Sequence, residues 1–312
     1  MKKIIRETDQ ERGIVQVTVA DERWYFKEAR DGATGNPTIK AVPSVTWIAG
    51  FYPKGIHFYK WLAEKGWDEA EALKQAAGDK GSKVHDAISA ILRGEEVRID
   101  SKFENKSKST EDNPIFEELA FEEIECIISF LDWKKEIEEE YVLESLAWDT
   151  TVFSEIHGFA GTLDWLVRVS HRKTGEVSYW IIDFKTSQYV WTEYQLQISA
   201  YRRALENGEN PILYKGQPVD VTNLKTAILQ LGYRKNKKRF KFTPVDDAFD
   251  MFLTAQTIWA KETAGQEPRK VDIPIVLSPA LTVDAATSEA KTAQPPLEAK
   301  PKHGKNRKHE NE

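Results

Sequence analysis

Asp183 and Lys185 lie two residues apart in an otherwise apolar stretch, residues 178–185, whose sequence is SYWIIDFK. Successive side chains of a β-strand point to opposite faces, so these two charged side chains would share one face of a strand. Burying such charges is costly unless they pair with each other or bind a metal ion. The stretch therefore indicates either a metal site with an adjacent lysine or an ordinary ion pair at the end of a strand.

Asp164 lies in the preceding apolar stretch, residues 161–169, and a polar turn near residue 173 joins the two stretches. A hairpin symmetric about that turn places Asp164 opposite Asp183. Directly opposed side chains have Cβ atoms roughly 4.5–5.5 Å apart, a distance at which two carboxylates repel. A divalent cation turns this repulsion into attraction, and sites rich in carboxylate oxygens suit Mg²⁺ or Mn²⁺. Spacing alone equally allows an Asp183–Lys185 ion pair with Asp164 on an exposed rim.

Two neighbouring features favour the metal site. Gly158 and Gly161 precede Asp164 and permit a bulge or a close approach of the backbone beside the carboxylate. Gln197 and Tyr201 stand four residues apart in a helical stretch that follows soon afterwards, so they lie on one face of that helix. The helix is close enough in the chain to fold back over the same site.

The elements that position these residues follow from the spacing of apolar side chains. Ser44 or Thr46 is expected to cap a first helix. Helices are predicted over residues 55–77, from about Asp79 to Leu92 with His85 on it, over 114–137 and over 192–207. Strands are predicted in an N-terminal hairpin over 13–28, near 141–143 and 151–153, and over 161–169, 178–185 and 226–233. These elements predict an α/β fold with a mixed central sheet flanked by helices, plus the extra N-terminal hairpin and helices.

Composition bounds the rest of the chain. The 312 residues are 40% hydrophobic, which is enough for one large core. We expect a short N-terminal segment over 1–13, one domain over 14–262 and a disordered tail over 263–312, where the sequence becomes rich in Pro, Ala, Lys and Glu. The net charge of −6 counts mildly against a nucleic-acid substrate, although a local basic strip suffices for binding.

Cysteine content and hydropathy exclude other classes. Cys126 is the single cysteine, so the chain has no disulfide framework and no site built from four cysteines. No apolar run approaches the roughly 18 residues that a membrane span needs, and the first residues turn polar too soon for a signal peptide. We therefore expect a cytoplasmic protein that makes no use of a membrane.

The ordered set of motifs resembles the RecB-type exonuclease branch of the PD-(D/E)XK nuclease superfamily. The match consists of Gly-x-x-Asp ending at Asp164, Asp-x-Lys ending at Lys185 and Gln-x-x-x-Tyr ending at Tyr201. Upstream, residues 81–85 resemble the histidine motif of that branch, and residues 43–46 resemble the opening of related phage and bacterial nucleases. The resemblance covers residues 139–233 and implies a restriction-endonuclease-like core ordered helix, three strands, helix, strand.

The resemblance also implies roles for individual residues. Asp164, Asp183 and the backbone carbonyl of Phe184 would bind Mg²⁺ or Mn²⁺, with His85 as a further ligand. Lys185 would orient the attacking water and stabilise the charge that develops on the phosphate. From its position alone, on the apolar side of a helix, His85 is more often a core histidine than a ligand, and only the resemblance reverses that preference. No iron–sulfur cluster is expected, because the cysteines that hold one in some members are missing.

Further residues receive looser assignments. Glu144 stands where the family often has an acidic residue on the first core strand, and Gln197 and Tyr201 would position their helix or contact the DNA backbone. Residues 234–241 hold six basic residues in eight. Within this run Lys237, Lys238 and Arg239 are candidate phosphate contacts. A solvated turn is the alternative interpretation of the run.

The sequence thus predicts a Mg²⁺- or Mn²⁺-dependent deoxyribonuclease, more in keeping with an exonuclease of DNA recombination, repair or phage DNA metabolism than with a sequence-specific enzyme. Its expected partner is DNA, and its expected origin is a bacterium or a phage. Two alternatives stay open. One is a non-catalytic nucleic-acid-binding module that kept the nuclease fold, and the other is a metal-dependent phosphohydrolase acting on a small substrate.

Overall fold

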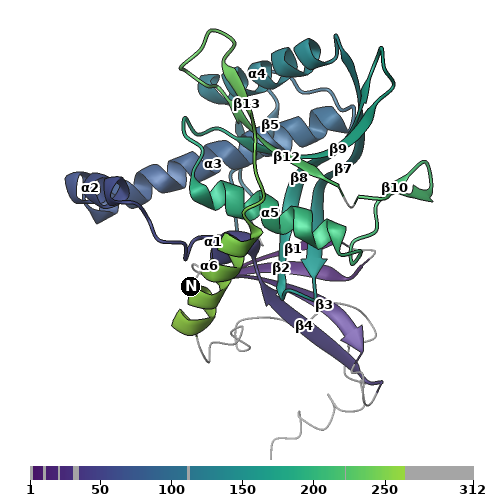
Figure 1. Ribbon diagram of the computed structural model, residues 1–312. Coiled ribbons are helices and arrows are strands. Elements are labelled where there is room, and N and C mark those ends of the chain that lie inside the picture. The colour runs from purple at the N-terminus through teal and green to yellow at the C-terminus, as the bar shows by residue number, and fades with distance from the viewer. Residues whose placement is uncertain are drawn as a thin grey trace, which may run out of the picture.

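The computed structural model describes residues 3–9, 12–19, 22–30, 35–110, 113–221 and 223–263 (Figure 1). Of the predicted tail, only Thr263 falls within the described residues. A five-stranded mixed sheet forms the centre of the molecule, in the order β13-β12-β9-β8-β7. Its strands are β7 (Tyr141–Ser154), β8 (Phe159–His171), β9 (Val177–Lys185), β12 (Lys225–Leu231) and β13 (Phe240–Pro244). The predicted mixed α/β fold with a central sheet and flanking helices is confirmed.

Helices cover both faces of this sheet because its strands are apolar on both sides. On one face, α3 (Trp67–Leu92) and α4 (Phe121–Ile137) pack against Ile182 and Phe184. On the other face, α1 (Val45–Ala49), α5 (Thr192–Glu206) and α6 (Phe249–Glu262) pack against Leu166 and Ile181. A buried ion pair between Lys83 and Glu123, 2.9 Å apart, joins α3 to α4.

The pairing of β9 with β12 is parallel, whereas the other neighbouring pairs in this sheet are antiparallel. A parallel pair requires a crossover, and α5 supplies it together with the small hairpin of β10 (Leu213–Tyr214) and β11 (Gln217–Pro218). The carboxyl ends of β9 and β12 and the start of α5 therefore meet at one edge of the sheet. Lys185 is the last residue of β9 and lies at that edge.

Several predicted boundaries were wrong. α3 is continuous from Trp67, and a break at Gly66, whose φ is 76°, separates it from α2 (Ile56–Lys65) instead of near residue 79. α4 begins at Phe121, because residues 116–118 form a short strand, β6, paired with β5 (Lys102–Glu104). The two strands predicted within residues 141–153 are one strand of 14 residues, β7.

The N-terminal region is larger than the predicted hairpin. It forms an antiparallel sheet of four strands: β1 (Lys3–Asp9), β2 (Ile14–Val19), β3 (Glu22–Arg30) and β4 (Pro37–Pro43). Ser44 follows β4, and its hydroxyl accepts a hydrogen bond of 3.1 Å from the Trp47 amide, so it is the predicted cap of α1. None of the helices in the described part of the chain is long and apolar enough to cross a membrane.

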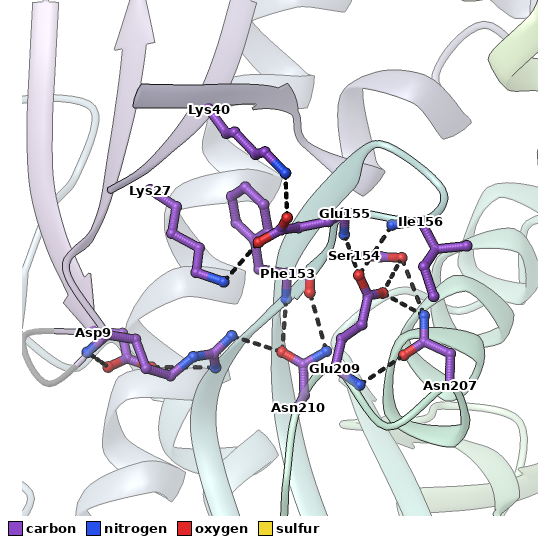
Figure 2. Close-up of polar contacts among 11 residues, drawn as sticks. Asp9, Lys27, Lys40, Phe153, Ser154, Glu155, Ile156, Asn207, Glu209 and Asn210 are labelled. Atoms are coloured by element: carbon purple, nitrogen blue, oxygen red, sulfur yellow. Dashed lines mark hydrogen bonds and ion pairs between the residues drawn. The ribbon is translucent and has the colours of Figure 1, made fainter. Parts of the chain in front are cut away.

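Asn210 joins the N-terminal sheet to the central one (Figure 2). Its side-chain amide donates to the carbonyls of Phe153 and Ala204, and its Oδ1 accepts from the Phe153 amide. The same Oδ1 accepts a hydrogen bond of 2.7 Å from Arg12, in the turn between β1 and β2. One buried amide therefore fixes β7, the end of α5 and the N-terminal sheet relative to one another.

Glu155 makes a second connection at the turn between β7 and β8. Its carboxylate pairs with Lys27 of β3, at 2.9 Å, and with Lys40 of β4 (Figure 2). Glu209 supports the same turn by accepting hydrogen bonds from the backbone amides of Glu155 and Ile156. The N-terminal sheet is thus attached to the central sheet by polar contacts as well as by apolar packing.

We predict that Asn210→Ala destabilises the protein by about 2 to 4 kcal/mol, because several buried backbone groups lose their hydrogen-bond partner at once. Chemical denaturation at neutral pH measures the loss. The matched control is Asn113→Ala, whose side chain is exposed; its effect should stay within about 0.5 kcal/mol. Equal stability of the two variants would contradict the bridging role of Asn210.

Candidate active site

The register between β8 and β9 brings the two predicted aspartates together. Trp165 lies opposite Ile182, and the same spacing places Asp164 next to Asp183. One carboxylate oxygen of Asp164, Oδ2, accepts a hydrogen bond of 2.7 Å from the backbone amide of Phe184. The hairpin symmetry that the sequence predicted is therefore the observed register.

His85 reaches these strands from α3. Its Nδ1 lies 3.1 Å from Oδ1 of Asp164, and its Nε2 lies 2.7 Å from the carbonyl oxygen of Phe184. Both partners are acceptors, so the ring satisfies both contacts only when both nitrogens carry a proton. Burial opposes the charged ring, but Asp164 outweighs this effect and raises the pKa of His85. The structure thus brings three of the predicted metal-binding groups into direct contact.

Asp183 is almost completely buried, with 1% of its side chain exposed, and its Oδ2 lies 2.6 Å from Nζ of Lys185. Its other oxygen, Oδ1, is buried without a hydrogen-bond partner in the described part of the chain. Burial raises the pKa of Asp183 to about 6, and the neighbouring charge of Asp164 adds to the shift. A carboxylate held in this way is costly to ionise, which is a common property of functional sites.

The pKa values of Asp164 and Lys185, in contrast to that of Asp183, shift in the direction that favours the charged form. Burial alone would raise the pKa of Asp164, but the charges of His85 and Lys185 lower it. Burial alone would lower the pKa of Lys185, but the carboxylates of Asp183 and Asp164 raise it. Asp164 therefore ionises before Asp183, and Lys185 keeps its positive charge at neutral pH.

Tyr201 packs α5 closely against β8. A Cβ atom on Gly161 would lie 2.5 Å from Cε1 of Tyr201, which is too close for any side chain. The Tyr201 hydroxyl accepts a hydrogen bond of 3.0 Å from Gln197. Gly161 thus makes room for the ring of Tyr201, whereas the sequence had linked this glycine to a bulge or a backbone approach beside the carboxylate. Gln197 lines the cleft over the aspartates.

A cleft of about 1140 Å³ opens over this cluster. His85, Asp164, Phe184 and Lys185 are among its lining residues, whereas Asp183 lies beneath them. Gln197 also lines the cleft, as do several residues that the sequence did not single out. The basic ones among these are Arg23, Lys74, Lys80 and Lys106, and Arg234 of the predicted basic run lines the cleft as well.

Lys106 lies in the loop between β5 and β6, a stretch rich in polar residues to which the sequence assigned no role. That loop is ordered around Asn105, whose backbone amide donates to the carbonyl of Ile115 and whose own carbonyl accepts from the Ser109 hydroxyl. Lys106 pairs with Asp86 of α3 at 2.9 Å. Its position depends on contacts between distant residues, which residue types within the loop do not reveal.

Asp149, and not Glu144, is the acidic residue of β7 that lies at the cleft. It stands opposite Asp164, between the pairs Trp148–Trp165 and Thr150–Leu163, and it has a positive φ of 45°. Desolvation by the surrounding protein raises the pKa of Asp149, although its side chain reaches solvent. Counting residues outward from the β7–β8 turn, as for the β8–β9 turn, would have placed Asp149 opposite Asp164.

Glu144 lies elsewhere on β7. Its carboxylate accepts a hydrogen bond of 2.5 Å from the Tyr214 hydroxyl and pairs with Arg168. The hydrogen bond from Tyr214 is the main reason why the pKa of Glu144 is lowered. Glu144 is not among the residues that line the cleft, so the structure does not bring it to the aspartates.

The basic run at residues 234–241 forms the turn between β12 and β13. Lys238 pairs with Glu136 at 2.6 Å and Arg239 pairs with Glu125 at 2.7 Å, both on α4. Lys237 is exposed. None of these three basic residues is among those that line the cleft.

The donor set fits an oxygen-preferring divalent cation. It consists of two carboxylates and a backbone carbonyl, with an imidazole beside them, and one buried carboxylate oxygen has no hydrogen-bond partner among the described residues. As they stand, no three His, Cys, Asp or Glu side chains in the described part of the chain are arranged to hold a metal ion. Lys185 holds Asp183, and His85 holds Asp164 and Phe184, so a cation would compete with these contacts.

Comparisons of the sequence with known proteins give no family for this chain. No protein-family model matches it, and no curated protein matches it either.

We predict that Asp183→Asn stabilises the metal-free protein at neutral pH, because burial makes the charged carboxylate of Asp183 costlier in the folded than in the unfolded state. The folded-state pKa of Asp183 is raised, so its stabilising contribution is complete below the unfolded-state pKa and is lost as pH rises through about 6. Thermal unfolding in a chelator at several pH values measures this. The stabilities of the variant and of the unaltered protein should become equal near pH 4, and equal stability at pH 7.5 would contradict the prediction.

Proposed function

We propose that this chain is a Mg²⁺- or Mn²⁺-dependent deoxyribonuclease with a restriction-endonuclease-like core of the RecB type. One observation carries the proposal: Asp164, Asp183, Lys185, His85 and the Phe184 carbonyl form a continuous polar cluster at the edge of the central sheet, beneath an open cleft. Such a cluster is costly to bury, and phosphodiester hydrolysis gives each of its members a role.

Asp164, Asp183 and the Phe184 carbonyl would hold the cation, with His85 as the fourth donor after it loses a proton. The cation supplies an activated water and polarises a phosphoryl oxygen. Lys185 is held in place by Asp183 and stays protonated. Its ammonium group presents fixed positive charge to the negative charge that develops on the phosphate.

The cleft favours a polymeric substrate over a small one. Its walls come from the N-terminal sheet through Arg23, from α3 through Lys74 and Lys80, from the loop at Lys106 and from the β12–β13 turn through Arg234. Positive charge spread over separate elements suits a chain of phosphates. A small phosphate ester needs a more enclosed pocket.

We predict that Lys185→Ala and Asp183→Asn each lower Mg²⁺-dependent cleavage of end-labelled DNA by at least about a hundredfold, because each removes a group that acts on the transition state. The controls are Lys135→Ala and Asp132→Asn, exposed residues of α4 that should leave cleavage unchanged. Full activity of Lys185→Ala would refute the proposed chemistry.

The same assay separates the alternatives. The protein is incubated with end-labelled linear DNA, with circular DNA and with free nucleotides, each with and without Mg²⁺. An exonuclease releases mononucleotides from linear DNA and spares the circle. Binding without cleavage identifies a non-catalytic module, and hydrolysis of nucleotides alone identifies a phosphohydrolase acting on small substrates.

The basic turn is proposed as a secondary contact with DNA outside the cleft. Exposed ion pairs such as those of Lys238 and Arg239 are worth at most about 1 kcal/mol, so phosphates can displace them. We predict that neutralising Lys237, Lys238 and Arg239 together lowers the slope of log K against log salt by roughly one per contact, without changing the cleavage rate of bound DNA.

Arg172 and Lys173 provide a matched control. Both are exposed, and both lie in the β8–β9 turn at the other end of β9 from Lys185. Their neutralisation should leave the salt slope unchanged. An unchanged slope in the Lys237, Lys238 and Arg239 variant would mean that the run is a solvated turn paired with α4.

A further inference from the structure

The loop between β9 and α5 carries two exposed aromatic side chains, Tyr189 and Trp191. Their exposed fractions are 57% and 51%, and their ring centroids lie 5.7 Å apart with an interplanar angle of 44°. About half of each side chain is therefore open to solvent. Large aromatic surface left in water has no role in folding, and such residues often mark a binding site.

Hydrogen bonds hold this loop in place. The side chain of Gln188 donates to the Gly232 carbonyl at 3.0 Å and accepts from the Arg234 amide at 2.8 Å. Gln230 of β12 donates to the Ser187 carbonyl at 3.0 Å. The end of β12 and the start of the β12–β13 turn thus brace the loop, so a ligand that stacks on the rings has little conformational entropy to overcome.

The aromatic pair is continuous with the cleft. Residues 186–188, which immediately precede Tyr189, line the cleft together with Lys185 and Arg234. Lys235 places its ammonium group 4.2 Å from the centroid of the Tyr189 ring. Aromatic faces and positive charge therefore lie side by side on the path that leads to the Asp164 and Asp183 carboxylates.

We propose that Tyr189 and Trp191 form a stacking platform for unpaired nucleobases of a DNA strand that enters the cleft. The inference rests on the proposed function, since it takes the cleft to be the DNA site. Stacking tolerates every base because every base has a π-face, while Lys235 and Arg234 contact the phosphates. In a duplex the faces of the bases are covered by their neighbours, so the platform selects DNA that carries a single-stranded segment.

The charges around the platform favour DNA over a protein partner. An aromatic patch that binds protein is surrounded by mixed polar groups, whereas this one borders Arg234 and Lys235 and the basic lining of the cleft. Trp67 offers a matched comparison, because it is more exposed, at 71%, but lies at the start of α3 and is not among the cleft-lining residues.

The test is fluorescence anisotropy with a labelled single strand of about 12 nucleotides, in a chelator so that nothing is cut. Tyr189→Ala and Trp191→Ala should each weaken binding by about tenfold, and the double variant by about a hundredfold. Trp191→Phe should retain most of the affinity, and Trp67→Ala should bind as the unaltered protein does. Thermal unfolding checks that the variants are folded, as expected for exposed rings.

Two further probes isolate stacking from charge. A blunt duplex of the same length should bind the double variant and the unaltered protein equally. An abasic strand should also bind both equally, because it keeps the phosphates and lacks the bases. The platform would be overturned if the double variant lost as much affinity for the abasic strand as for the normal strand. It would also be overturned if the variant lost no affinity for the normal strand.

The outcomes also separate this inference from the proposed function. If the Tyr189 and Trp191 variants bind single strands as tightly as the unaltered protein and still cleave DNA in Mg²⁺, only the platform is overturned. Binding of single strands through the platform, without cleavage in Mg²⁺, supports the platform and overturns the nuclease. A protein that binds neither single strands nor duplex overturns both.

Discussion

The buried charge of Asp183 is the constraint around which the central sheet is arranged. Its carboxylate lies inside the protein with one oxygen unpartnered among the described residues, and the ion pair with Lys185 offsets only part of the cost. An apolar residue on β9 would be more stable there. The surrounding contacts, from His85 on α3 to Tyr201 on α5, hold strands and helices in place around a group that weakens the fold, as expected where stability is given up for function.

The sequence predicted those features that depend on neighbouring residues. The β8–β9 register followed from the symmetry of one hairpin, and the cap at Ser44 followed from its position before an apolar helix. Asp149 was missed because the sequence divided β7 into two strands. Without one continuous strand, residues could not be counted from the β7–β8 turn to place Asp149 opposite Asp164. Lys106 was missed because its position depends on contacts that local composition does not encode.

The N-terminal sheet has a role beyond the small hairpin that its first residues suggested. Tyr25 of β3 contacts the Thr162 hydroxyl at 3.2 Å and accepts a hydrogen bond from Gln16 at 2.6 Å, and both Gln16 and Thr162 line the cleft. Asn210 fixes this sheet to β7 from the other side. The position of one wall of the cleft therefore rests in part on contacts made far from the aspartates, those of Asn210 among them.

The charge distribution around the cleft bears on the proposed binding of DNA by a protein of net charge −6. Around the cleft the basic side chains have acidic partners: Lys80 and Arg234 pair with Glu122, and Lys106 pairs with Asp86. Exposed pairs of this kind contribute at most about 1 kcal/mol each, so a phosphate that displaces one gains little net energy. If the proposed DNA substrate is correct, charge at the rim guides it only weakly and without sequence preference. Under the proposed function, tighter binding would come from a cation held by the carboxylates beneath the cleft and from stacking on the exposed rings of Tyr189 and Trp191.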